Sequence, residues 1–229
     1  DNPIPFVVVA VDPDRRFHIV DYGYAPDTEL AEKYSIDVYD HQDKGPQIAV
    51  SRVAADHGFA PTEQQKFCRR LRRKKVKVQM CKGSSSELST WYRQSKLGKD
   101  SATPGEILIN VDTFRTQMWV EKVLYTLTQD DPEGISVFDA PAEEHHDLAI
   151  QLMNDEADEK GRWNKIWDDD ENDYRDCLRY AKVIMERETR GRRPAPRVKQ
   201  PPAQPKKDRK REGGFVRRPK REGFVRRRR

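Results

Sequence analysis

The feature that most constrains the fold is an apolar run that ends in an acid and then turns back. Residues 6–12 read FVVVAVD, the segment 13–15 reads PDR, and residues 16–22 read RFHIVDY. Proline and aspartate favour tight turns, so the two apolar stretches are predicted to pair as a β-hairpin. A carboxylate beside a buried strand is costly unless a positive group compensates it. Asp12 therefore needs such a partner.

Strand-like and helix-like patterns alternate along the rest of the chain. Residues 24–46 and 83–105 are polar and rich in turn formers, which predicts loops, with a short extra strand as an alternative for the first. A hairpin followed by alternating strands and helices indicates an α/β fold, with helices packed on a mixed central sheet. Further strands are predicted at 47–56, 75–80, 106–111 and 135–139, and helices from Pro61, at 113–127, at 143–159 and at 172–189.

The charge is distributed very unevenly. The 229 residues have a formal net charge of +5, yet residues 191–229 carry 17 Lys and Arg against 3 acidic residues. Residues 1–190 are consequently acidic. We therefore expect one globular domain over 1–190 and a basic, Pro- and Arg-rich tail over 191–229 that is disordered in isolation. A polyanionic partner is expected for the tail.

Several classes of protein are disfavoured by the composition. No segment has the roughly 20 consecutive apolar residues that a membrane span needs, and no signal peptide is evident. The chain opens directly before a strand, as a piece of a longer protein would. Cys68, Cys81 and Cys177 form no CxxC pair, so neither a zinc site nor a disulfide scaffold is expected, and a reducing intracellular setting fits best.

Three aspartates lie directly beside apolar sequence. Asp12 ends the first strand, Asp56 ends the run VAAD, and Asp176 lies in NDYRDCLRYA on the last predicted helix. If they converged, their oxygens would suit Mg²⁺ or Mn²⁺. Two such ions about 3.5–4 Å apart can activate water and stabilise the leaving oxygen of a phosphodiester. Alternatively, each aspartate is a helix cap or a turn residue, roles that Asp favours.

Five motifs resemble a known family when they are taken in order. They read VAVDPDRRFHIVDYG; VAADHGF with FCRRLRRKKVKVQMCKG; INVDTFRTQMWVEKVL; LAIQLMNDE; and NDYRDCLRYA. The chain resembles the C-terminal nuclease domain of the large subunit of tailed-phage DNA-packaging terminases, in particular the lambda-like branch. The resemblance runs through most of residues 7–185.

The resemblance implies a ribonuclease H-like fold and metal-dependent cleavage of double-stranded DNA. Asp12, Asp56 and Asp176 would be the catalytic, metal-binding acids, holding two Mg²⁺ or Mn²⁺ ions. The implied partners are an upstream ATPase motor domain, the terminase small subunit and the capsid portal, in the host-cell cytoplasm. Residues 1–229 contain no GxxxxGK[ST] phosphate-binding loop, so the motor would lie upstream.

A basic segment follows the second acidic strand and is predicted to contact DNA phosphates without reading sequence. A solvated helix face is the alternative for each of its side chains. The predicted contacts are Lys66, Arg69, Arg70, Arg72, Arg73, Lys74, Lys75 and Lys77.

The roles of Asp14, Asp173 and His57 stay open at the level of sequence. Asp14 and Asp173 are either auxiliary carboxylates or surface acids, and His57 either assists proton transfer or fills the rim of the site. Two other functions are also open. One is an RNase H-like nuclease of the resolvase or transposase type, and the other is a non-catalytic module that binds DNA or the portal.

Overall fold

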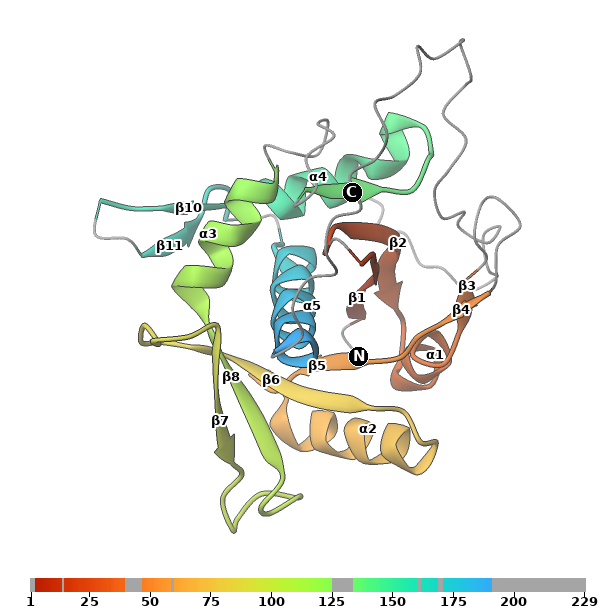
Figure 1. Cartoon of the computed structure of the whole chain (residues 1–229), viewed down its shortest axis with the longest axis vertical. Coiled ribbons are helices and arrows are strands. Elements are labelled where there is room, and N and C mark those ends of the chain that lie inside the picture. The colour runs from red at the N-terminus through yellow and green to blue at the C-terminus, as the bar shows by residue number, and fades with distance from the viewer. Residues whose placement is uncertain are drawn as a thin grey trace.

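The computed structural model is a mixed α/β protein with five α-helices (Figure 1). It describes residues 3–13, 15–39, 47–58, 60–124, 134–159, 162–168 and 171–190. Asp14 and the tail predicted over 191–229 lie outside these residues. Within them, no helix combines the length and the apolar character needed to cross a membrane.

The first sheet is built on the predicted hairpin. Strands β1 (Ile4–Val11) and β2 (Phe17–Ala25) are antiparallel, and β9 (Ile135–Val137) adds to β2 in parallel. The register shifts between Val8 and Val9, as at a β-bulge. The hairpin prediction is confirmed, with Asp12 lying just beyond the end of β1.

The second sheet has the order β5-β6-β8-β7. Strands β5 (Val53–Asp56), β6 (Val78–Ser84) and β8 (Ile107–Asp112) are parallel, and β7 (Tyr92–Lys96) is antiparallel to β8. Two short pairs complete the strands: β3 (Val38–Tyr39) with β4 (Ile48–Ala49), and β10 (Asp155–Ala157) with β11 (Trp163–Lys165).

The two larger sheets are covered by helices whose apolar faces are visible in the sequence. In α2, Phe67, Cys68 and Leu71 are buried, as their helical spacing predicts. They pack on one face of the second sheet, in a cluster that includes Met80 and Leu108. The five helices are α1 (Thr28–Tyr34), α2 (Pro61–Arg73), α3 (Thr113–Leu124), α4 (His146–Met153) and α5 (Asp173–Thr189), and a 3₁₀ turn (Ala142–His145) precedes α4.

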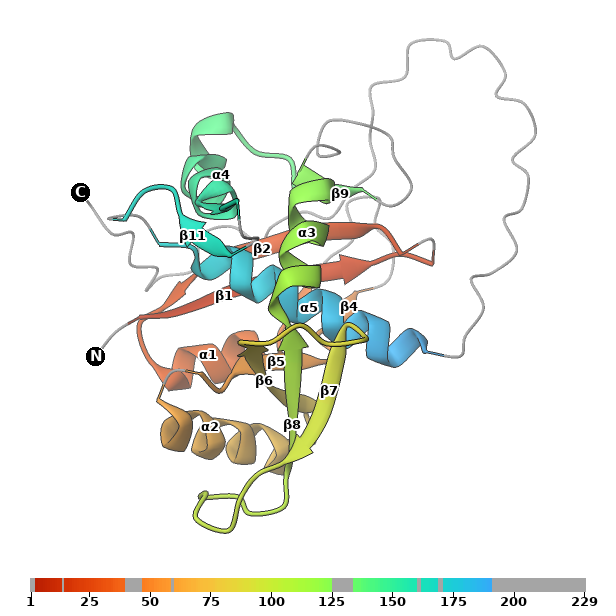
Figure 2. The same cartoon turned by 90° about the vertical axis from the view of Figure 1, so that its left-hand side faces the viewer.

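Helix α5 lies between the two sheets (Figures 1 and 2) and contacts both β1 and β5. Leu178, on one side of the helix, belongs to the apolar cluster of β2, β9, α3 and α4. Val183 and Ile184 belong to a second cluster with Cys81 and Ile109, on the face of the second sheet opposite α2. The predicted helix over 172–189 is thus confirmed as the element shared by both cores.

The sequence predicted a single central sheet, whereas the described residues form two larger sheets. Among the described residues, β1-β2-β9 and β5-β6-β8-β7 are separate sheets. The mixed α/β class is confirmed, and the finer ribonuclease H-like arrangement stays a prediction. Strands β1 and β5 are not paired with each other, and α5 contacts both of them.

Three segments differ from the sequence prediction. The polar segment 24–46 contains helix α1, which begins after Asp27 because the Asp27 carboxylate accepts a hydrogen bond from the backbone N–H of Leu30 at 2.8 Å. The predicted loop 83–105 contains β7. The helix predicted over 143–159 ends at Met153, and β10 begins two residues later at Asp155.

Candidate acidic site

Asp56 is held at the carboxyl end of β5. Its Oδ1 accepts hydrogen bonds from the Tyr180 hydroxyl at 3.0 Å and from the backbone N–H of Gly58 at 2.8 Å. A Cβ at position 58 would lie 3.2 Å from Oδ1, closer than most such contacts, so the turn after Asp56 suits glycine. Asp56 is consequently a fixed carboxylate that two neutral donors compensate in part.

Asp176 lies in the first turn of α5 and faces the same region. Its Oδ1 pairs with the guanidinium of Arg179, one turn along the helix, and its side chain is 40% exposed. Burial raises the pKa of the Asp176 carboxyl; Arg179 acts against this, and the negative charges of Asp155 and Asp56 add to it. Asp176 is thus a partly solvent-accessible acid that is paired with Arg179 and lies near other negative charges.

Tyr180 links Asp56 to the helix that carries Asp176. It follows Asp176 by four residues, so the two side chains share one side of α5, and its hydroxyl donates to Asp56. Burial raises the pKa of the Tyr180 phenol, and the charges of Asp176 and Asp56 raise it further. The tyrosine thus stays a hydrogen-bond donor at neutral pH. We call Asp56 and Asp176 the acidic pair.

Asp12 does not join the acidic pair. Cys177, next to Asp176, lies with its Sγ 3.8 Å from the carbonyl oxygen of Pro5, near the start of β1. Asp12 is seven residues further on, roughly 20 Å along an extended strand. There its carboxylate accepts from the backbone N–H of Arg16 at 2.9 Å and lies 3.4 Å from Nε2 of His18. The hydrogen-bond partners of the Asp12 carboxylate are thus local to the hairpin.

The predicted three-acid metal site is therefore not assembled in this structure. Within the described part of the chain, no group of three or more His, Cys, Asp or Glu side chains is arranged to hold a metal ion. A shared ion needs ligand oxygens at about 2.0–2.6 Å, which Asp12 cannot provide together with Asp56 and Asp176. The predicted pair of ions stays a prediction of the motifs.

Other acids near the pair were not singled out as ligands from the sequence. Asp155 is buried and accepts hydrogen bonds from Gln117 at 2.9 Å and from Asn172 at 3.0 Å. It also lies 3.4 Å from the buried guanidinium of Arg175. These contacts tie α3, β10 and α5 together. The only sequence signal for Asp155 is its place between an apolar helix and a turn, which does not distinguish it from a surface acid.

Asp173, whose role the sequence left open, belongs to a polar cluster at the start of α5. Its carboxyl lies 3.4 Å from the Tyr24 hydroxyl, which also donates to Glu171. Burial raises the pKa of Asp173 to about 6, with the neighbouring charges of Glu171 and Asp176 adding to the effect. Asp173 is thus a half-buried acid close to the pair.

His57 follows Asp56 but packs into the sheet. Its Nε2 lies 2.9 Å from the side-chain amide nitrogen of Gln65, and its backbone N–H donates to Cys81. Burial lowers the pKa of His57, and the nearby charge of Lys82 lowers it further. A buried imidazole that is already hydrogen-bonded to Gln65 favours a packing role for His57 over a role in proton transfer.

Most of the predicted DNA-binding side chains have partners within the protein. Lys66 pairs with Glu63, Arg72 with Glu106, and both Arg70 and Lys74 with Glu32. Arg69 donates to the backbone carbonyl of Ala102. The remaining three, which are exposed at the end of α2 and in the segment that follows it, are Arg73, Lys75 and Lys77. DNA contact by all eight residues stays a prediction.

Comparisons with known protein families, with curated proteins and with solved structures find no match to this chain. Proposals on function therefore depend on the geometry above and on the motifs in the sequence.

Proposed function

We propose that the chain is a nuclease domain that hydrolyses phosphodiesters of double-stranded DNA, and that it serves as the cleavage module of a viral terminase large subunit. The observation that carries the proposal is that Asp56, at the end of β5, accepts a hydrogen bond from Tyr180, which lies one turn after Asp176 on α5. A carboxyl group whose pKa is raised by burial and by like charges is typical of catalytic sites.

The acidic pair offers two distinct chemical roles. Asp176, whose pKa is raised, is suited to accept a proton from an attacking water molecule. Asp56, held by Tyr180 and Gly58, is suited to orient that water through a hydrogen bond. Because the three predicted ligands do not converge, we assign no step to a metal ion, and the Mg²⁺ or Mn²⁺ requirement stays an expectation of the motifs.

The partners of such a module are part of the same proposal. Cleavage of concatemeric DNA during packaging requires a duplex, a motor that moves it and a portal that receives it. The members of the basic segment best placed to contact phosphates are the exposed Arg73, Lys75 and Lys77. No acid among the described residues pairs with Arg73 or Lys75. Lys77 is exposed as well, although it lies near Glu188.

A plasmid-nicking assay on the full chain with Mg²⁺ or Mn²⁺ tests the proposal. We expect Asp56→Asn and Asp176→Asn each to lower the nicking rate about 100-fold or more, as for the loss of a proton-transfer group. Asp12→Asn is the matched control, since the Asp12 carboxylate hydrogen-bonds within its own turn and to His18, away from Asp56 and Asp176. Circular dichroism and thermal melting should show that all three variants are folded.

Two results would contradict this assignment. Wild-type rates in both Asp56→Asn and Asp176→Asn would exclude catalysis by the pair. An equal loss in Asp12→Asn would show that the three acids act together, in an arrangement other than the one described here.

A non-catalytic binding module is the second candidate. The observation that favours it is that both acids of the pair already have partners in the protein, Tyr180 and Arg179. Binding of linear duplex without nicking by the wild-type chain would support this candidate. Preferential cutting of branched over linear duplex would instead support a resolvase-type nuclease.

A further inference from the structure

Three side chains with the chemistry of a nucleophilic hydrolase meet at the hairpin end of the first sheet. The hydroxyl oxygen of Ser136, on β9, lies 2.7 Å from Nδ1 of His18, on β2. The other ring nitrogen, Nε2, lies 3.4 Å from Oδ2 of Asp12, just beyond β1. A serine, a histidine and an aspartate joined in this order can activate the serine for attack on a carbonyl carbon.

The direction of the two hydrogen bonds follows from the chemistry of the outer groups. The carboxylate of Asp12 can only accept, so its bond requires the ring proton of His18 to be on Nε2. In the neutral imidazole Nδ1 then accepts from the Ser136 hydroxyl. His18 is therefore placed to take the serine proton. Bonds of this kind are often long without substrate and tighten when it binds.

The strands of the first sheet fix this arrangement. His18 pairs with Ala10 of β1 and with Ser136 of β9, so these three side chains share one face of the sheet. Phe17 and Ile19, on either side of His18, point to the opposite face, where they are buried in the cluster that includes side chains of α5. The three groups therefore lie on the face turned away from α5, which carries one acid of the acidic pair.

Solvent reaches this face, and Asp12 is fixed on it. The side chains of His18 and Asp12 are 26% and 35% exposed, and Ser136 is half-buried. Oδ1 of Asp12 accepts from the backbone N–H of Arg16 at 2.9 Å, which leaves Oδ2 for His18. The nucleophile is thus accessible, and the group that orients its base is held by the turn.

Arg16 supplies a positive charge on the same face. It precedes His18 by two residues, and alternate residues of an extended chain share a face. Its Nε is buried and has no hydrogen-bond partner among the described residues. A buried donor needs an acceptor, and the oxyanion that forms when a serine attacks an ester is one.

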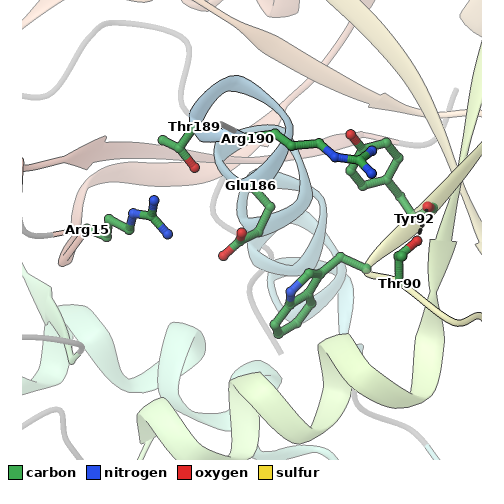
Figure 3. A pocket seen from close by; sticks show the side chains of 7 residues that line it. Arg15, Thr90, Tyr92, Glu186, Thr189 and Arg190 are labelled. Atoms are coloured by element: carbon green, nitrogen blue, oxygen red, sulfur yellow. Dashed lines mark hydrogen bonds between the residues drawn. The ribbon is translucent and has the colours of Figure 1, made fainter. Parts of the chain in front are cut away.

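Arg15, the preceding residue, is directed elsewhere. It lines a pocket together with Glu186 and Thr189 of α5 (Figure 3), and it already has an interaction within the protein. Arg16 is consequently the one guanidinium counted for this site. A single cation suits the one negative oxygen of an ester adduct better than the several charged oxygens of a phosphate, which usually need metal ions or more cations.

We propose that Ser136, His18 and Asp12 form a catalytic site, separate from the acidic pair, that hydrolyses carboxylic esters. Oγ of Ser136 attacks the carbonyl carbon while its proton passes to Nδ1 of His18, and Arg16 stabilises the negative oxygen. The bond to the leaving alcohol then breaks, and His18 gives the proton to that alcohol. Water hydrolyses the acyl-serine by the same route, which releases the carboxylic acid and restores the hydroxyl. Asp12 is a positioning residue that holds the imidazole in the required tautomer.

Covalent labelling tests this proposal without any nicking. The full chain, with a chelator present, is incubated with a fluorophosphonate probe, whose phosphorus bonds to an activated serine with loss of fluoride. We expect mass spectrometry to find the adduct at Ser136. p-Nitrophenyl acetate tests the substrate class: nitrophenol should be released, and samples quenched with acid during turnover should carry an acetyl group on Ser136.

Four variants assign the roles. Ser136→Ala should abolish labelling. His18→Gln and Arg16→Gln should each slow it about 100-fold, as for the loss of a general base and of a donor to the oxyanion. Asp12→Asn should lower the maximal labelling rate about tenfold or more, because an amide permits the wrong tautomer, without changing the probe concentration that gives half of that rate. Asp12→Glu should restore part of the rate.

Ser89→Ala and His146→Gln are the matched controls, because both residues are exposed and lie outside this site. They should label as wild type, and thermal melting should show that all the variants are folded. An unlabelled Ser136, or equal labelling of Ser136 in wild type and His18→Gln, would overturn the proposal. So would release of nitrophenol without an acetyl group on Ser136. None of these outcomes bears on the acidic pair, because nicking is not the readout.

Discussion

At the scale of single residues, Asp173 shows that negative charges lie close together at the start of α5. Its carboxyl is half-buried beside Glu171 and Asp176, and the hydroxyl of Tyr24 lies 3.4 Å from it. Burial and the two like charges raise the pKa of Asp173 from 3.8 to about 6. The folded protein therefore holds a proton at Asp173 at a pH where the unfolded chain has released it.

This difference predicts how the free energy of unfolding depends on pH. Between about pH 4 and pH 6 the folded state binds more protons at Asp173 than the unfolded state does, so stability falls as the pH rises and levels off above 6. Asp173→Asn should remove this slope. The free energy of unfolding of the variant, relative to that of wild type, should be higher at pH 7 than at pH 4 by about 1–2 kcal/mol, after allowance for solvent screening. Urea unfolding at several pH values measures it, and parallel curves for the two proteins would refute it.

At the scale of elements, a buried acid joins the first two helices. Glu32, on α1, is 7% exposed and pairs with Arg70 and with Lys74, the latter at 2.8 Å, at the end of α2. Burial on its own raises the pKa of Glu32, but the hydrogen bonds from Lys74 and Arg70 outweigh this and lower it overall. Two of the cations expected from the sequence to contact DNA thus stabilise the packing of α1 on α2.

We predict that Glu32→Gln lowers the free energy of unfolding by about 1–3 kcal/mol at neutral pH, because a buried position loses its charge and two charged donors lose their partner. Since the folded-state pKa of Glu32 is lowered, its contribution is present above about pH 4.5 and is lost as the pH falls below that value. Urea unfolding at pH 7 and pH 3.5 tests both points.

Glu63→Gln is the matched control for this measurement. Glu63 pairs with Lys66 on the exposed face of α2, with 62% of its side chain accessible to solvent. An exposed pair of this kind contributes little. If both variants lost the same amount, burial of Glu32 would not be the cause.

At the scale of the whole molecule, α5 packs against both sheets. Leu178 is fully buried in the cluster around β2 and β9, and Val183 is fully buried against β6 and β8. The two strands that flank α5 are not hydrogen-bonded to each other, so side-chain packing joins the sheets. The cluster under α2 contributes to this, since Phe6 and Ala25 of the first sheet pack in it together with Ala55 and Met80 of the second.

We therefore expect Leu178→Ala to destabilise both sheets together, by about 2–5 kcal/mol as for other buried Leu→Ala changes. Calorimetry should show one transition at a lower temperature. Hydrogen exchange should show loss of protection in β2 and in β6 alike. Met153→Ala, at an exposed site, should change little. Loss of protection confined to β2 would show that the sheets are independent.

Sequence patterns predicted individual strands and helices better than they predicted how these elements pack together. The hairpin, the buried stripe of α2 and the extent of α5 follow from periodicity and turn residues, which are local properties. The separation of the sheets depends on which edges pair across long stretches of chain, and a pattern of alternating strands does not determine this. Asp56 is joined to the helix of Asp176 by its hydrogen bond with Tyr180, a contact between distant segments, whereas Asp12 accepts its hydrogen bond inside its own turn.

The place of α5 in the chain order also constrains how the protein can be made. It is the last element described, yet two of the three apolar clusters include its side chains. A nascent chain that has produced every strand but not yet residues 173–189 would expose the surfaces that this helix later covers. Such exposed apolar surface and open strand edges favour aggregation and binding by chaperones. During synthesis, completion of the native core therefore waits for the final helix.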